Sequence, residues 1–421
     1  MKIRPRLKGL IPPALRSRNY RLFFSGQLIS LIGSWMTQVA TIWLVYHLSQ
    51  SPLLLGIVGF TGQIPSFILL PFAGVFIDRF NRHHVIIATQ IFAMLQSLAL
   101  AVLAFTGLIN IWHIIILSFC QGVINAFDAP ARQAFVPEMV ERREDLANAI
   151  ALNSSMFNGA RLIGPAIAGL LISTIGTSYC FLIDGLSYIA VIIGLLAMKI
   201  QPRNIAVTDH NPLERLKEGF AYAFGFPPIR SLLLLLALVS LVAMPYTILV
   251  PVFATKILQG GPDTLGFLMA ASGVGALGGA IYLSTRKSIL GIGKLIAISP
   301  AVMGLGLIGF SLSHVLWLSL VMMVIVGIGF ILQFTSGNTF LQTIVEDNKR
   351  GRVMSIYAMA FFGVTPIGNL LAGGLANYIG AANTLMIGGT LCILGSWIFM
   401  KQLPALKCLV RPIYAQLGLL P

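Results

Sequence analysis

An arginine stands inside a long apolar run of this sequence, where its charged side chain could bind an anionic or hydroxylated group. Arg161 lies in the run 147–175, and Ser154 and Asn158 precede it at i−7 and i−3, which places the three side chains on one face of a helix. A guanidinium at the centre of a membrane helix costs at least about 2.5 kcal/mol, so we expect it to face a wet cavity or a partner. Its planar fork suits an anionic or hydroxylated group. The alternative is a structural arginine that binds backbone carbonyls or pairs with an acid from another helix.

An aspartate is the second charged residue in an apolar context. Asp184 lies within Phe-Leu-Ile-Asp-Gly-Leu, near the outer end of the run 179–199. A carboxyl group removed from water can take up and release a proton, which makes Asp184 the candidate for coupling transport to an ion gradient. The alternative is a carboxyl group near the external interface that water reaches.

Neutral polar side chains occur in several other apolar runs. An amide inside a membrane helix can line a cavity, or it can join one helix to another. The further candidates for the cavity wall are Gln38, Gln121, Asn125, Gln333, Asn338 and Asn369.

A charged turn separates two apolar runs at Gly74-Val-Phe-Ile-Asp-Arg-Phe-Asn-Arg82. Gly74 permits close approach of two helices, Asp78 suits the positive end of a helix, and Arg79 and Arg82 can reach lipid headgroups. We expect this turn to belong to a gate at the cytoplasmic mouth that latches one conformation and opens in the other. The alternative is solvated interfacial charge, which contributes little. The other expected members of the gate are Asp128, Arg132, Arg350 and Arg352.

Glycine and proline mark a candidate bend in the run that carries Arg161. Pro165 removes a backbone hydrogen bond, and Gly164 and Gly169 allow neighbouring helices to approach. Both features are also common in membrane helices without a role in gating.

Composition shows which elements must position these residues. The chain has 421 residues, of which 57% are hydrophobic and 10% charged, and these proportions exclude a soluble enzyme. Since a membrane-spanning helix needs roughly 20 apolar residues, we predict an all-α membrane protein with 12 transmembrane helices. The predicted spans are 20–47, 53–77, 84–106, 110–127, 147–175, 179–199, 230–257, 263–284, 292–313, 315–340, 351–378 and 382–401.

The basic residues predict the orientation of these spans. Of the 28 Lys and Arg residues, all but Lys256 and Arg161 fall on the side that holds the N-terminus, which the positive-inside rule makes cytoplasmic. An even number of spans then places the C-terminus on the same side. This distribution accounts for the net charge of +15 without a nucleic-acid partner.

The spans divide into two halves around the longest connection. We expect a basic cytoplasmic N-terminus at 1–19, six-helix bundles at 20–199 and 230–401, a cytoplasmic linker at 200–229 and a cytoplasmic tail at 402–421. The linker contains Asn-Pro-Leu-Glu at 211–214, the pattern of a capping box that begins an amphipathic helix. The halves echo each other, since Leu-Gly opens both the second and the eighth span, at 55–56 and 265–266. Such repeats are typical of rocking transporters with a site near the midplane.

Four stretches together resemble the major facilitator superfamily, in the drug:proton antiporter branch that includes the enterobactin exporter and macrolide efflux permeases. They are the Gly-x-x-x-Asp-Arg-x-x-Arg turn at 74–82, Asp-Ala-Pro-Ala-Arg at 128–132, the segment 153–169 with Gly-Pro at 164–165, and Arg-Gly-Arg-Val-Met-Ser at 350–355. The resemblance implies the major facilitator fold, alternating access and ion-coupled export. The first span departs from the branch, because many relatives have an acid after the glycine where this chain has Gly33-Ser34. Ser34 cannot carry a proton.

These observations predict a secondary active transporter of the bacterial inner membrane that exports a siderophore or an amphipathic drug-like compound. Its expected partners are the small-molecule cargo, membrane lipids and a coupling ion, H⁺ foremost. The sequence has no Walker loop and no His-Glu-x-x-His, so we expect no cofactor, no metal and no catalytic residue. The alternatives are a lysophospholipid or lipid flippase of the same fold, a membrane-embedded enzyme, and a sensor or scaffold that does not transport.

Overall fold

The computed structural model describes residues 12–200, 212–286 and 288–418. Within these ranges, 12 helical segments are long and apolar enough to cross a membrane, and no strand occurs. The predicted all-α architecture with twelve spans is therefore confirmed.

The first half contains six continuous helices. After the short 3₁₀ helix η2 (Pro13–Arg16), these are α1 (Arg18–Ser49), α2 (Pro52–Arg79), α3 (Arg82–Phe105), α4 (Ile111–Met139), α5 (Leu146–Thr174) and α6 (Thr177–Leu196), with η3 (Arg143–Asp145) before α5. Side-chain caps mark several of their starts: Ser51 accepts a hydrogen bond from the backbone N–H of Leu54, and Asn110 accepts one from that of His113. These caps satisfy N–H groups that have no partner inside the helix.

The second half follows α7 (Pro212–Gly225), and two of its spans are broken. Its seventh span consists of α8 (Pro227–Val242), α9 (Tyr246–Val252) and the π-helical turn η4 (Phe253–Ile257), and its eleventh of α13 (Asp347–Ala358), the π-helical turn η5 (Met359–Gly363) and α14 (Val364–Ile379). Pro245 and Pro366 lie at or beside these breaks, where the missing N–H groups leave the helical ladder incomplete. The continuous spans are α10 (Pro262–Thr285), α11 (Ile292–Leu312), α12 (Leu316–Ile344) and α15 (Ala381–Gln416).

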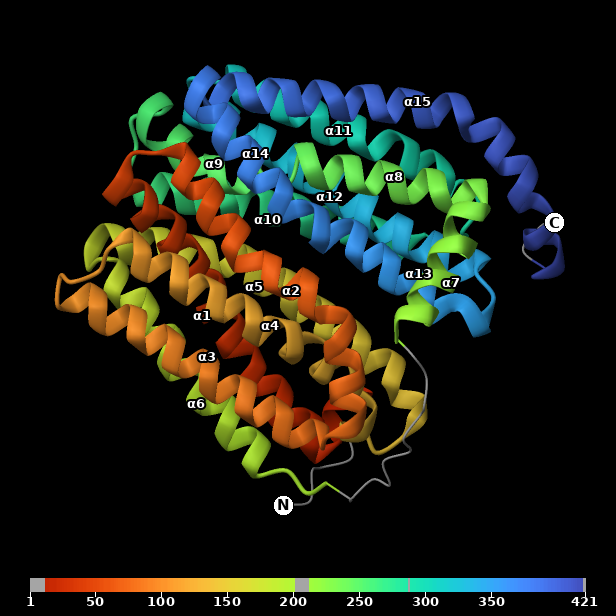
Figure 1. Cartoon of the computed structure of the whole chain (residues 1–421), viewed down its shortest axis with the longest axis horizontal. Helices are drawn as coiled ribbons and strands as arrows, with labels where there is room; N and C mark the ends of the chain where they lie inside the picture. Colours follow the sequence, from red (N-terminus) through yellow and green to blue (C-terminus); the bar gives the residue numbers. More distant parts are fainter. Residues whose placement is uncertain (1–11, 201–211, 287, 419–421) are drawn as a thin grey trace.

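The helices of each half pack into a bundle, and the two bundles lie side by side (Figure 1). In the first, α1 packs on α5 and α6, and α3 on α6; in the second, α12 packs on α10 and α11, and α11 on α15. Because the helices alternate in direction, the turns that connect them lie at two opposite ends of the molecule. We call the end with α7, η3 and the C-terminal part of α15 the linker end, and the end with the turns at Gly176 and Gly380 the far end. Those two turns are equivalent in the two halves, and both glycines have a positive φ, of 98° and 85°, which other residues rarely adopt.

Two helices are longer than the sequence predicts. Whereas we expected the fourth span to end at residue 127 and the last at 401, α4 continues to Met139 and α15 to Gln416. In α4 the extension carries Asp128 and Arg132, which pair with each other, so polar residues continue the helix beyond its apolar part. In α15 the extension is held by Leu403 and Leu406, which are buried against the second bundle.

The predicted amphipathic helix of the linker corresponds to α7, although the expected cap Asn211 lies outside the described residues. α7 packs against α13: Ala223 is buried there, and the ammonium of Lys349 lies 4.5 Å from the centre of the Tyr222 ring.

Candidate substrate cavity and gate

Arg161 lies near the middle of α5 and reaches across to the other half. Its side chain is buried, with 8% of the residue exposed, and its guanidinium carbon lies 4.4 Å from the centre of the Phe330 ring. Phe330 is the central residue of α12, so the contact joins the two bundles near the membrane midplane. Among the described residues, no carboxylate forms an ion pair with Arg161. A cation against an aromatic face is worth up to about 2 kcal/mol when desolvated, so the guanidinium is stabilised there while its hydrogen-bond donors are not matched by an acid.

Ser154 and Asn158 lie on the same face of α5 as Arg161, as the sequence predicts. Asn158 lies one turn and Ser154 two turns nearer the linker end, and both bond within their own helix, Asn158 Nδ2 to the Ser154 carbonyl at 2.8 Å and Ser154 Oγ to that of Ile150 at 3.1 Å. Since Arg161 faces α12, this whole face is directed toward the other half. Ser154 is exposed, as expected for the wall of a space that contains water.

Aromatic rings form the opposite wall. Phe330, Phe334 and Phe361 have ring centres 4.9–6.0 Å apart, and Tyr357 lies 5.7 Å from Phe334. Phe361 comes from η5, so the π-helical turn brings the eleventh span into this cluster. The combination of one guanidinium and several phenyl rings can hold a molecule that has an anionic or hydroxylated group beside an apolar or aromatic part.

The other predicted cavity residues take several positions. On α4, Gln121 donates to Asn125 at 3.1 Å, and on α12 Asn338 accepts from Gln342 at 2.6 Å. Gln38 is exposed on α1, whereas Gln333 is buried on α12. Asn369 is buried in the contact between α14 and α2: it is 1% exposed, and its amide lies 2.9 Å from the position that a Cβ on Gly59 would occupy.

Two glycine-rich contacts, which we call the seams, close the far end between the halves. In the first, a Cβ placed on Gly266 of α10 would lie 2.8 Å from Cα of Gly169 on α5. In the second, a Cβ placed on Gly373 of α14 would lie 2.7 Å from Cα of Gly56 on α2. The seams are equivalent under the repeat, because Gly56 and Gly266 follow the matching leucines of the second and eighth spans. Backbones can approach so closely only where side chains are absent.

Toward the linker end, α5 lies apart from the helices of the second half. Gly159 of α5 has no atom of another helix within 4 Å of a Cβ position, and beyond it Ser154 and Ser155 are exposed. On α12, Thr339 and Gln342 are exposed over the same depth. These side chains bond within their own helices, and their exposure is as expected for walls that water reaches. Close glycine contacts thus join the halves at the far end, whereas polar side chains of α5 and α12 are exposed toward the linker end.

The predicted gate residues lie at the linker end. Asp128 is 4% exposed; it accepts from Thr89 at 2.9 Å and from Gln90 at 2.8 Å, and its other oxygen lies 2.7 Å from Nε of Arg132. Arg82 binds Glu138 at 2.9 Å. These contacts join α3 to α4 within the first half.

The remaining gate residues lie on both halves. Arg79 is exposed at the end of α2, and Arg352 of α13 pairs with Glu218 of α7 in the second half. Arg350 also lies on α13. The surroundings of Gly74 and the side chain of Asp78 lie outside the described part of the chain. Each described ion pair of a gate residue thus stays on one side of the cavity.

Asp184 is buried away from the cavity, between α6, α1 and α3. It is 2% exposed; Ser97 donates to it at 2.8 Å and Ser34 at 3.4 Å, and Ser34 Oγ also lies 3.2 Å from the hydroxyl of Tyr188. A Cβ placed on Gly33 would lie 2.8 Å from its Oδ1. The carboxyl group therefore lies beside Gly33 and Ser34, the point of α1 at which this sequence departs from the pattern that the family resemblance implies.

The predicted bend motif serves close packing. Gly164 lies against α1, where a Cβ would be 2.5 Å from that of Trp35, and Gly169 lies in the first seam. Pro165 is inside α5, which continues from Leu146 to Thr174.

Sequence reasoning missed the ring that Arg161 contacts in the other half. Phe330 and Phe361 were not singled out, and nothing in their local sequence distinguishes them from other phenylalanines of the spans. Gly56 and Gly266 were noticed as a repeat, and that signal could have identified the seams. Within the described residues, no group of three His, Cys, Asp or Glu side chains could hold a metal ion.

Comparisons with known proteins agree with this architecture. A family model described as transmembrane secretion effector matches residues 10–410. The chain is 26% identical to the staphyloferrin A transporter of Staphylococcus aureus over 92% of this chain and 97% of that protein. It is 26% identical to macrolide efflux protein A of Streptococcus pyogenes, over 89% and 94% of the two chains. A crystal structure of a bacterial homologue of the human lysosomal transporter Spinster superposes with a TM-score of 0.64 at 18% identity, covering 95% of this chain and 98% of that one.

Proposed function

Because the chain belongs to the transmembrane secretion effector family of the major facilitator superfamily, we propose that it exports a small molecule by alternating access across the bacterial inner membrane. The observation that carries this proposal is the position of Arg161: a buried guanidinium without a carboxylate partner among the described residues, at the midplane, between two bundles that are joined at one end. Transporters of this architecture place their cargo site there.

The linker end is the cytoplasmic end in this proposal. Of the two ends, it is the one to which the basic residues of the sequence belong, and the positive-inside rule supports this orientation. The structure then represents the inward-open state, in which cargo enters from the cytoplasm. Export follows when the seams part and the linker end closes.

The cargo is an amphipathic molecule with an anionic or hydroxylated group. Its anionic group would bind the fork of Arg161, and its apolar part would pack on Phe330, Phe334 and Phe361. Among relatives, one is named for staphyloferrin A and another for macrolides, and both a siderophore and a drug-like compound meet this description. Cargo that draws the guanidinium away from Phe330 would break a contact between the halves, which couples binding to their movement.

Asp184 is the proposed site of proton coupling. Ser34 follows Gly33 where the family resemblance would imply an acid. The carboxyl group of Asp184 reaches this point of α1 from α6, and Ser97 and Ser34 donate hydrogen bonds to it. Taking up or losing a proton there changes the charge between α1, α3 and α6, which form one face of the first bundle.

The gate residues form the proposed latch of the other state. When the linker end closes, the ends of α2 and α4 approach α13, which brings Arg79 and the Asp128–Arg132 pair near Arg350 and Arg352. An interface that must form and break during each cycle suits exposed or half-buried charges rather than apolar packing.

The proposal is tested in cells and in proteoliposomes. Disrupting the gene should raise the intracellular level of the cargo; a lower level would show that the protein imports. A panel of an anionic siderophore, a macrolide and a cationic dye would define the cargo class. Transport of the cargo by purified protein should be lost in Arg161→Ala and partly kept in Arg161→Lys, which retains the charge without the fork. Wild-type rates in Arg161→Ala would remove Arg161 from the site.

A further inference from the structure

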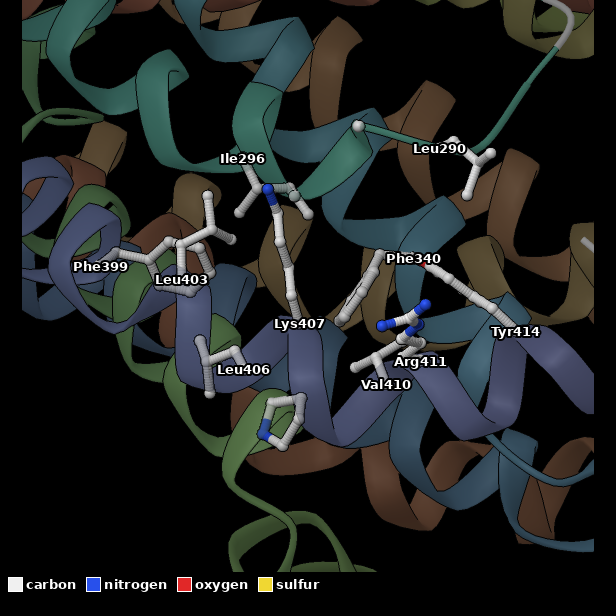
Figure 2. Close-up of a pocket in the computed structure, with 13 residues that line it drawn as sticks. Leu290, Ile296, Phe340, Phe399, Leu403, Leu406, Lys407, Val410, Arg411 and Tyr414 are labelled. Carbon is white, nitrogen blue, oxygen red and sulfur yellow. The ribbon is translucent and has the colours of Figure 1, made fainter. Parts of the chain in front are cut away.

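The extended last helix borders a pocket at the linker end, within the second half and apart from the central cavity. The pocket has a volume of about 230 Å³ and is bounded by α15, the start of α11, α12 and α8. Its walls include Ile296, Phe340, Phe399 and Leu403 (Figure 2). The first bundle contributes none of its lining residues, so the pocket belongs to one rigid half and does not depend on the opening of the cavity.

The length of α15 explains how this pocket arises. The helix has 36 residues, whereas about 20 suffice to cross the hydrocarbon core. Its last turns therefore extend past the span, into the region of the lipid headgroups. Pro404 and Pro412 lie inside this extension, and α15 curves toward its C-terminal end (Figure 1), as expected of a helix with internal prolines. Leu406 and Val410 pack against the bundle and leave the pocket beside them.

Two basic side chains reach into this apolar pocket. Lys407 and Arg411 lie four residues apart on α15, which puts them on one face, and both extend into the pocket (Figure 2). No Asp or Glu occurs anywhere in α8, α11, α12 or α15. Among the described residues, neither cation forms an ion pair with a carboxylate. Lys401, one turn or more closer to the membrane centre, instead lies over Trp397, with its ammonium 3.6 Å from the ring centre.

We propose that this pocket binds an anionic phospholipid, with its phosphate held by Lys407 and Arg411 and an acyl chain laid along Ile296, Phe340 and Leu403. The two basic side chains favour a phosphate, and the apolar walls favour an acyl chain. An anionic phospholipid carries both groups. A free phosphate would leave the apolar walls uncovered, and a lipid without net charge would gain nothing from the charges of Lys407 and Arg411, both of which are exposed. The depth agrees, because the basic side chains lie where the spanning part of α15 ends and lipid phosphates are found.

The charge requirement is tested by lipid retention. Purified full-length protein is exposed to an equimolar mixture of phosphatidylglycerol and phosphatidylcholine, and bound lipid is counted by native mass spectrometry. The wild type should retain phosphatidylglycerol preferentially. The double variant Lys407→Gln/Arg411→Gln should lower that preference about thirty-fold, the effect expected of two basic side chains at a membrane surface. The matched control is Arg142→Gln/Arg143→Gln, which removes two exposed charges at the linker end of the first half and should retain lipid as the wild type does.

The acyl-chain requirement is tested by filling the pocket. Gly293 lines it, and a Cβ there would lie 3.1 Å from Cδ1 of Leu403, so Gly293→Leu occupies the apolar volume and leaves both cations in place. This variant should also lose phosphatidylglycerol, and excess glycerol phosphate should not displace the lipid from the wild type. Retention by both pocket variants would overturn the proposal, and displacement by glycerol phosphate would show a site for free phosphates instead. Thermal unfolding of each variant checks that its fold is intact.

Discussion

One added methyl group at Gly373 should shift the equilibrium between conformations away from the far-end-closed state described here. Gly373 and Gly374 are neighbours on α14, yet a Cβ at position 373 would lie 2.7 Å from both the Pro52 carbonyl oxygen and Cα of Gly56, whereas nothing lies within 4 Å of one at position 374. Gly373→Ala and Gly374→Ala thus add the same atom to the same helix. Both gain up to about 1 kcal/mol of helix propensity, and this gain applies in every conformation and cancels between states.

The difference lies in the seam. Overpacking of a close contact costs typically about 1–3 kcal/mol, and Gly373→Ala incurs this cost only while the far end is closed. The ratio of far-end-closed to far-end-open protein should therefore fall about 5- to 150-fold. Gly374→Ala should leave the ratio unchanged.

Distances between spin labels measure this ratio. Thr174 and Tyr378 are exposed at the far end of different halves, and cysteines at these positions can carry nitroxides after the exposed Cys120 and Cys408 are replaced by serine. In Gly373→Ala the distance distribution should shift to longer values, while Gly374→Ala keeps that of the parent. If Gly373→Ala keeps the parent distribution, the seam is not the contact that opens, and the alternating-access assignment of α2 and α14 is wrong.

Three further changes test the other parts of the account. Phe330→Leu removes the ring beside Arg161, a contact worth about 1–2 kcal/mol, and should change the cargo KM about 5- to 30-fold; an unchanged KM would separate Phe330 from the site. Asp184→Asn keeps the size of the side chain and removes its charge, so proton-driven uptake into inside-out proteoliposomes should stop while exchange of labelled for unlabelled cargo continues; proton-driven uptake at the normal rate would exclude Asp184 as the coupling group. Asp128→Ala leaves Arg132, Thr89 and Gln90 without their shared acceptor and should destabilise the first half by about 2–4 kcal/mol, seen as a lower Tm in detergent, with Glu141→Ala, an exposed acid, as the control that leaves Tm unchanged.

The sequence predicted what depends on local composition. Twelve spans follow from apolar runs, and the polar face of α5 follows from helical spacing, because both are properties of one segment. What the runs could not show is where a helix continues past the lipid, as α4 and α15 do, since those extensions are stabilised by the Asp128–Arg132 pair and by the burial of Leu403 and Leu406.

Contacts between residues of the two halves could not be predicted from sequence patterns, for a different reason. An amide within a span can line water or join two helices, and Asn369 lies in a seam although it was predicted for the cavity wall. Phe330 was indistinguishable from any apolar residue of a span until α5 and α12 were placed face to face. Only the Leu-Gly sequence that recurs in the two halves indicated the seams. Equivalent spans of the two halves make equivalent contacts, and the glycine of each Leu-Gly pair lies in one seam.

Labelling of a cysteine at position 154 tests whether the Arg161 face lines a water-filled cavity that is open at the linker end. With Cys120 and Cys408 replaced by serine, Ser154→Cys is exposed to a membrane-impermeant maleimide in inside-out and in right-side-out vesicles. We expect rapid labelling in inside-out vesicles, slow labelling in right-side-out vesicles, and protection by the transported cargo. Failure to label from the cytoplasmic side, with reaction only toward a lipid-soluble reagent, would place this face against lipid and contradict the account.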